Sequence, residues 1–234
     1  MAYKSSEKTR KKKDAKRTAM MQAAVRVFAK KGYHAATVRD VVKAAGVAIG
    51  TFYFYFPDKE TLFLYLYEET SDFLIQTIQQ AISGKKHLLD QIEAGLQAYV
   101  NLGVYEPTIV QLLLVGGVGA VPSLSEKRAQ FRDRLTMMWQ YVLDVAVQAG
   151  QIVEQNTRRS AEMMAGGFDE IILNLLNHPT PDLGAAAAIE DMFTIALRLI
   201  GYLYEEEIDG SPISGNDPKD SPNDNRHNSP SPPA

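Results

Sequence analysis

The stretch TVRDVVKAAGVAIGTFYFYFPDKETL, Thr37 to Leu62, decides the fold of this 234-residue chain. Apolar residues at positions 38, 41, 42 and 45 form one face of a short helix. Thr37 and Asp40 have the spacing of a capping box, and Gly46 is placed to end the helix. A second helix must then start near Ala48, and two short helices joined by a few residues that include glycine are typical of a helix-turn-helix.

Phenylalanine and tyrosine alternate strictly from Phe52 to Phe56, a pattern that also suits a strand. No other segment reads as a pairing strand, and an isolated strand leaves its backbone groups unsatisfied. A helix followed by a turn is therefore favoured. In that arrangement Phe52 and Phe56 face the core, whereas Tyr53 and Tyr55 face outward with wet hydroxyls.

Residues 37–53 and 55–62 resemble the DNA-binding domain of the tetracycline-repressor (TetR) family, and the helix expected over residues 15–31 fits its first helix. The resemblance covers about residues 17–64. It implies an all-α fold with an N-terminal three-helix, helix-turn-helix DNA-binding domain, residues 17–62. A larger C-terminal helical domain for ligand binding and dimerisation, residues 63–208, would follow.

The resemblance also implies where DNA is contacted, because the helix from near Ala48 would enter the major groove. Arg39 can make bidentate contact with a guanine edge, and Lys59 lies at the positive end of a helix dipole, where a phosphate would bind. Ala48 and Ile49 can touch a thymine methyl group but supply no hydrogen bond. The predicted DNA contacts are Thr37, Arg39, Ala48, Ile49, Gly50, Thr51, Tyr53, Phe54, Tyr55 and Lys59.

Charge is distributed unevenly along the chain. Residues 1–60 carry 14 Lys and Arg against 5 Asp and Glu, a net +9, whereas the whole chain has a net charge of −3. The first half therefore suits a polyanion and the second does not. Residues 1–16 are expected to form a basic flexible arm, which either follows the DNA backbone and an adjacent minor groove or is only a solvated tail.

The second half reads as helices throughout, over about residues 59–81, 88–105, 108–116, 124–148, 158–177 and 182–207. The last two combine small and large aliphatic residues, which suits either a two-fold four-helix interface or intrachain core. A homodimer through residues 158–177 and 182–207 is the favoured interpretation, because a helix-turn-helix commonly needs two half-sites. Residues 209–234 hold six of the chain's eleven prolines, and we expect a disordered tail there.

A ligand cavity for a hydrophobic or amphipathic effector is expected among the helices of the second half, with ordinary core as the alternative for each residue. Large side chains on these helices would form the walls, and a few polar groups would orient the ligand. The candidates are Tyr99, Tyr105, Phe131, Met138, Trp139, Phe168, Asp169 and Asn174.

Other classes of function have less support in the sequence. The chain has no cysteine, four scattered histidines, and no phosphate-binding loop or nucleophile motif, so we expect no metal, no cofactor and no enzyme. The N-terminus lacks an apolar signal sequence, which predicts a cytoplasmic protein. Glycines and a proline interrupt the long uncharged window at residues 107–125, which argues against a membrane-spanning helix. The sequence thus favours a homodimeric, ligand-responsive repressor on a palindromic operator. The alternatives are a nonspecific nucleoid DNA-binding protein and, with less support, a helical enzyme that binds a small molecule.

Overall fold

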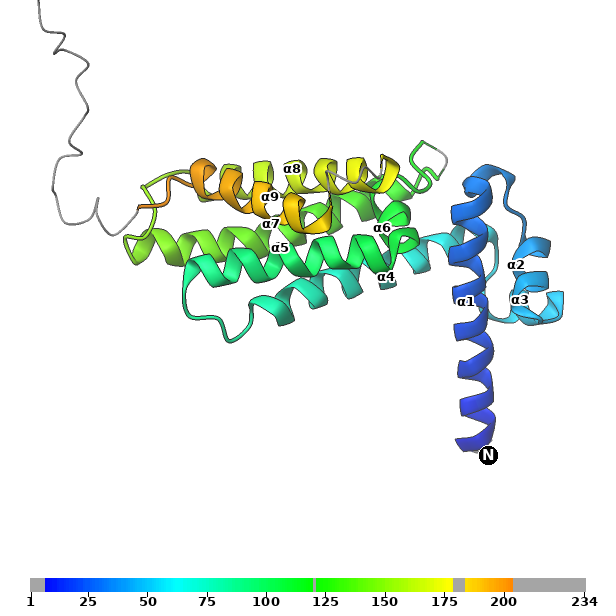
Figure 1. Ribbon diagram of the computed structural model, residues 1–234. Coiled ribbons are helices and arrows are strands. Elements are labelled where there is room, and N and C mark those ends of the chain that lie inside the picture. Colours follow the sequence, from blue (N-terminus) through cyan, green and yellow to red (C-terminus); the bar gives the residue numbers. More distant parts are fainter. Residues whose placement is uncertain (1–6, 120, 179–183, 204–234) are drawn as a thin grey trace, which may run out of the picture. The chain divides into compact units, whose positions relative to one another are not determined.

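The computed structural model describes residues 7–119, 121–178 and 184–203, and for residues 7–13 only the backbone. Within these ranges the chain forms nine α-helices (Figure 1). They are α1 (Glu7–Ala35), α2 (Val38–Ala45), α3 (Ile49–Tyr55), α4 (Lys59–Ile82), α5 (Leu88–Tyr105), α6 (Pro107–Leu114), α7 (Leu124–Gln148), α8 (Thr157–Asn177) and α9 (Ala185–Leu199). The all-α prediction is confirmed. We call α1–α3 the head and α4–α9 the body.

The first helix is longer than the sequence pattern predicts. It begins at Glu7, so the predicted start at Ala15 is wrong. Near its other end Gly32 has a φ of 73°, a conformation outside the helical region that glycine adopts readily and that breaks the helix there. The predicted arm, residues 1–16, lies partly outside the described residues and stays a prediction.

The two short helices are fixed by local hydrogen bonds at their ends. The Thr37 hydroxyl accepts from the Asp40 amide at 3.1 Å, and an Asp40 carboxylate oxygen accepts from the Thr37 amide at 3.0 Å. Gly46 adopts the left-handed conformation with a φ of 66°. This confirms the predicted capping box and helix end, and α2 and α3 pack beside α1 (Figure 1).

The body is built in three layers. Helix α5 contacts α4 on one side and α8 and α9 on the other, and α7 contacts α4 and α8, so the two helices lie between α4 and the last pair (Figure 1). Trp139 of α7 lies edge-on to Phe168 of α8 in the buried interior, with 6.0 Å between ring centroids. The predicted bounds of α5 and α7 are confirmed.

The last helix ends earlier than predicted. It stops at Leu199 and not at residue 207, because Gly201 turns left-handed with a φ of 60° and Tyr202 forms an antiparallel bridge with Ile152. Residues 182–183 and 204–207 of the last predicted helix lie outside the described residues, as does the predicted tail.

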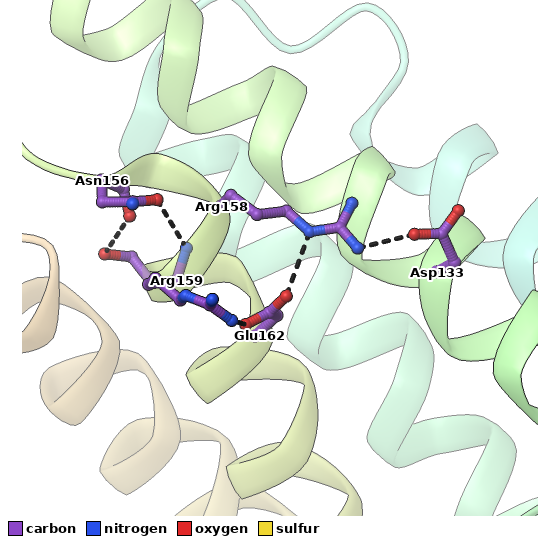
Figure 2. Close-up of polar contacts among 6 residues, drawn as sticks. Asp133, Asn156, Arg158, Arg159 and Glu162 are labelled. Atoms are coloured by element: carbon purple, nitrogen blue, oxygen red, sulfur yellow. Dashed lines mark hydrogen bonds and ion pairs between the residues drawn. The ribbon is translucent and has the colours of Figure 1, made fainter.

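A polar network anchors the start of α8 against α7 (Figure 2). Asn156 caps α8 through its side-chain oxygen, which accepts from the Arg159 amide at 3.1 Å. Arg158 donates to Asp133 of α7 at 2.6 Å and to Glu162 at 3.1 Å, and Glu162 also accepts from Arg159 at 2.6 Å. These groups are partly or largely exposed, so the network sets the register of α8 more than it stabilises the fold.

No helix among the described residues is both long and apolar enough to cross a lipid bilayer.

Candidate nucleic-acid interface

Helix α3 divides its aromatic residues between the core and the surface. Phe52 and Phe56 are buried, as expected, and their ring centroids lie 5.8 Å apart. Tyr53 and Phe54 are 55% and 66% exposed, and Ile49 at the start of the helix is 46% exposed. Tyr55, which the sequence predicts to face outward, is instead half-buried and packs against the core. The helix therefore presents an apolar and aromatic surface with one fully outward tyrosine hydroxyl.

This surface carries no charge of its own, so it suits apolar contact with base edges better than bidentate hydrogen bonding. Ala48, Ile49 and Gly50 are exposed at the N-terminal end of α3, and Thr51 is half-buried. An ideal Cβ on Gly50 would meet no atom within 4 Å, which leaves room for a close approach. These four residues lie together as the resemblance implies.

The neighbouring helix α2 supplies the positive charge. Arg39 and Lys43 are exposed, and Thr37 lies exposed at the N-cap. The one acidic residue of α2, Asp40, is neutralised by Lys31 of α1, whose ammonium lies 2.6 Å away. The hydrogen bond from Lys31, helped by those from Thr37, lowers the pKa of Asp40 to about 2. The net effect is a basic edge beside the uncharged α3 surface, which fits a polyanion such as DNA.

Lys59 is placed differently from the other predicted contacts. Its ammonium donates to the carbonyl oxygens of Tyr33 at 2.7 Å and Ala36 at 2.9 Å, and it lies 4.2 Å from the centroid of the Tyr33 ring. Asp58, as expected, caps α4 by accepting from the Thr61 amide at 2.7 Å. Nine of the ten predicted residues thus lie in the α2–α3 region, whereas the side chain of the tenth, Lys59, points toward the end of α1.

The predicted ligand residues do not gather around one cavity. Tyr99, Phe131, Trp139, Phe168 and Asp169 are buried in the body and packed. Tyr105, in contrast, is 78% exposed at the end of α5, and Asn174 is exposed and donates to Glu170. The expectation that Tyr105 and Asn174 line an interior site is therefore not met, because both lie on the outward faces of their helices.

Two of the buried polar groups form a pair that the sequence could not assign. The Tyr99 hydroxyl donates to an Asp169 oxygen at 2.5 Å, and Arg132 donates to the other oxygen at 2.7 Å. Burial raises the pKa of Tyr99 well above its ordinary value, and Asp169 adds to that shift. Asp169 thus links α5, α7 and α8 inside the body and is not free to meet a ligand.

A groove of about 630 Å³ lies between α4 and α7, and of the predicted ligand residues only Met138 lines it. Its walls are mainly apolar, and they include large side chains at positions 137, 141 and 145 of α7. This i, i+4, i+8 spacing marks one helix face. This spacing is visible in the sequence, but it fits an ordinary core face equally well, so the sequence alone does not identify the groove.

Comparison with known proteins agrees with the head geometry. Residues 20–66 match the family model described as bacterial regulatory proteins of the tetR family. The fatty acid metabolism regulator protein of Bacillus subtilis is 27% identical over 186 residues, which cover 75% of this chain and 91% of that protein. Residues 20–66 are thus similar to the DNA-binding domain of TetR-family regulators. The transcriptional regulator EthR of Mycolicibacterium smegmatis is 29% identical over 176 residues, 71% of this chain and 73% of its own.

Solved structures of TetR-like regulators share the fold. The fatty acid degradation regulator FadR from Bacillus halodurans superposes with a TM-score of 0.71 at 23% identity, covering 78% of this chain and 94% of its own. FadR from Bacillus subtilis, solved in complex with stearoyl-CoA, gives 0.70 at 23% identity, with 80% and 99% covered. The chain is accordingly a DNA-binding transcriptional regulator, as are the relatives that it matches along most of its length.

Proposed function

We propose that this regulator is a TetR-family repressor that binds a palindromic operator as a homodimer and is released by a ligand with a long acyl chain and an anionic head. The observation that carries the DNA-binding part is the exposed, uncharged α3 surface beside the basic edge of α2. An apolar recognition surface reads thymine methyl groups, and the basic edge holds the backbone.

The dimer would form through the outer faces of α8 and α9. Met163 of α8 and Ile195 of α9 are 62% and 54% exposed, so both apolar side chains are available to a partner. An ideal Cβ on Gly167 of α8 would meet nothing within 4 Å, so a partner helix can approach closely there. A two-fold axis through these faces would give two heads, as a palindrome requires.

The effector would bind in the groove between α4 and α7. Its volume of about 630 Å³ is within the usual range for small-molecule sites. Met137, Tyr141 and Val145 are large, apolar and 54%, 72% and 47% exposed along one face of α7. The further apolar walls are Ile75 and Ile82 of α4 and Met138 and Val142 of α7.

Two cations border this groove and suit an anionic head. Lys85 follows the end of α4, and Arg134 lies on α7. Arg134 is paired with Asp72 of α4 at 2.6 Å, and both side chains are 50% exposed. A ligand phosphate or carboxylate could therefore replace Asp72 at Arg134 without a large desolvation cost. Two similar proteins, a fatty acid metabolism regulator and a FadR solved with stearoyl-CoA, support a ligand of this class, with an acyl chain and an anionic head.

Replacement of Asp72 would loosen α4 from α7, and α4 leads directly from the head. The ligand would then favour the conformation in which α4 is displaced, and it would weaken operator binding only by its preference for that conformation.

Selection of bound sequences from a random duplex pool tests the DNA part. Recovery of a palindrome with half-sites about one helical turn or more apart is expected of a two-headed repressor. Binding without any enriched motif, with affinity governed almost wholly by salt, would instead favour a nonspecific nucleoid protein.

Release of the selected duplex by stearoyl-CoA tests the effector part, with free coenzyme A as the control for the head group alone. We expect release by stearoyl-CoA only, lost in Tyr141→Glu. Asp72→Asn should lower the concentration needed, because the competing carboxylate is removed. Arg159→Ala, a cation on α8 outside the groove, is the matched control and should respond like the wild type. Equal release by free coenzyme A, or release unchanged in Tyr141→Glu, would overturn the assignment.

A further inference from the structure

Lys59 opens α4, at a position where a DNA phosphate would be expected to bind. Its ammonium has three protons and no capacity to accept. Two of them reach the carbonyl oxygens of Tyr33 at 2.7 Å and Ala36 at 2.9 Å, and the His34 carbonyl oxygen lies at 3.5 Å. The Tyr33 ring lies below the ammonium at 4.2 Å, within the range of a cation–π interaction. These contacts point the Lys59 ammonium toward the protein and not toward the surface that would face DNA.

The carbonyl groups that receive Lys59 belong to the last turn of α1, at Tyr33 and His34, and to Ala36 directly after it. Gly32 leaves the helical conformation there, so the regular helical hydrogen bonding is interrupted, and the Ala36 amide returns to the Gly32 carbonyl at 3.2 Å. The last carbonyl groups of a helix lack partners within the helix and carry its negative dipole end. A lysine ammonium satisfies both needs.

The N-terminus of α4 is also occupied already. The Asp58 carboxylate accepts from the Thr61 amide, and that hydrogen bond lowers the pKa of Asp58. A carboxylate in this position takes the seat that an incoming phosphate would use. Glu60 adds a second negative charge next to Lys59 and accepts a hydrogen bond from Ser123, just before α7.

We infer that Lys59 is a positioning residue, which ties the first turn of α4 to the turn between α1 and α2 and makes no phosphate contact. Ala36, one of its partners, directly precedes Thr37, the N-cap of α2. Lys59 therefore sets where α2 starts relative to α4, and through α2 it sets the exposed α3 surface. Because Glu60 reaches the body in the same turn, residues 59 and 60 join the head to the body.

Chemical footprinting tests this inference without any substitution. The full chain is acetylated with and without a duplex of about three helical turns, and the modified lysines are located by mass spectrometry. Lys30, exposed on α1, serves as the reactive internal reference, and Lys43, exposed on the basic edge, as a lysine that DNA should protect. We expect Lys59 to resist acetylation equally in the free and bound states. Fast modification of Lys59 in the free protein, followed by protection on DNA, would overturn the inference.

Salt dependence of DNA affinity gives the second test. A phosphate-contacting lysine contributes about 0.9 to the slope of log affinity against log salt. We expect Lys59→Met to keep the wild-type slope while its affinity and melting temperature fall, and Lys59→Arg to recover part of both.

Val42→Ala is the matched control, since it weakens the buried core of the head and changes no charge. Its phenotype should resemble that of Lys59→Met. A slope lowered by nearly one in Lys59→Met, with an unchanged melting temperature, would contradict the positioning role. If Lys59→Met does not fold, the footprint alone decides.

Discussion

The hydrogen bond from Tyr99 to Asp169 offers the sharpest stability test in the body. Tyr99 is 1% exposed, and its hydroxyl donates at 2.5 Å to a carboxylate that is itself buried. Tyr99→Phe removes the hydroxyl and keeps the ring, so it opens no cavity larger than one oxygen atom. Asp169 keeps its second partner, Arg132, at 2.7 Å. The substitution therefore reports on one hydrogen bond to a carboxylate.

The expected loss follows from the chemistry of that bond. Hydrogen bonds to charged groups contribute about 1.5–3 kcal/mol net. Arg132 remains and is 46% exposed, so water around it can compensate part of the loss. We therefore expect the free energy of unfolding to fall by about 2 kcal/mol. For a chain of this size that corresponds to a melting temperature lower by about 4–8 °C.

Urea and thermal unfolding followed by circular dichroism measure the difference. All proteins are compared at one fixed concentration, because the stability of a dimer depends on its concentration. Tyr105→Phe is the matched control, because the Tyr105 ring is 78% exposed, and it should stay within about 0.5 kcal/mol of the wild type. If Tyr99→Phe were as stable as Tyr105→Phe, the Tyr99–Asp169 bond would contribute nothing to the folded state and the reasoning would be refuted.

Four further changes test the head. Gly46→Ala forces a side chain into a left-handed conformation and should cost about 1–2 kcal/mol in thermal unfolding, whereas Gly50→Ala, in an ordinary helical conformation with open space, should stabilise by about 0.5–1 kcal/mol. Asp40→Ala should be less stable than the wild type at neutral pH. Its deficit should vanish in acid titrations as the pH falls from 3.8 toward about 2, because the lowered pKa of Asp40 gives stability only while the carboxylate is ionised. Arg39→Ala should relax base preference at one operator position by about 1–3 kcal/mol in competition binding; a uniform loss across all sequences would contradict a base contact.

Much of the head could be predicted from the sequence because its determinants are local. The capping box joins residues three apart, Gly46 ends α2 by its own backbone freedom, and Phe52 and Phe56 share a helix face by spacing alone. The same holds for the bounds of α5 and α7, where apolar periodicity runs without interruption.

Tertiary structure decided the partners of the polar groups. Lys59 meets a carbonyl 26 residues earlier in the chain, and Tyr99 meets a carboxylate 70 residues later. Helical periodicity shows which face of a helix is apolar, but it carries no information on which distant group that face will meet. For the same reason the sequence identified large side chains in the body, and only the packing of α4 against α7 separated the residues of the groove from those of the core.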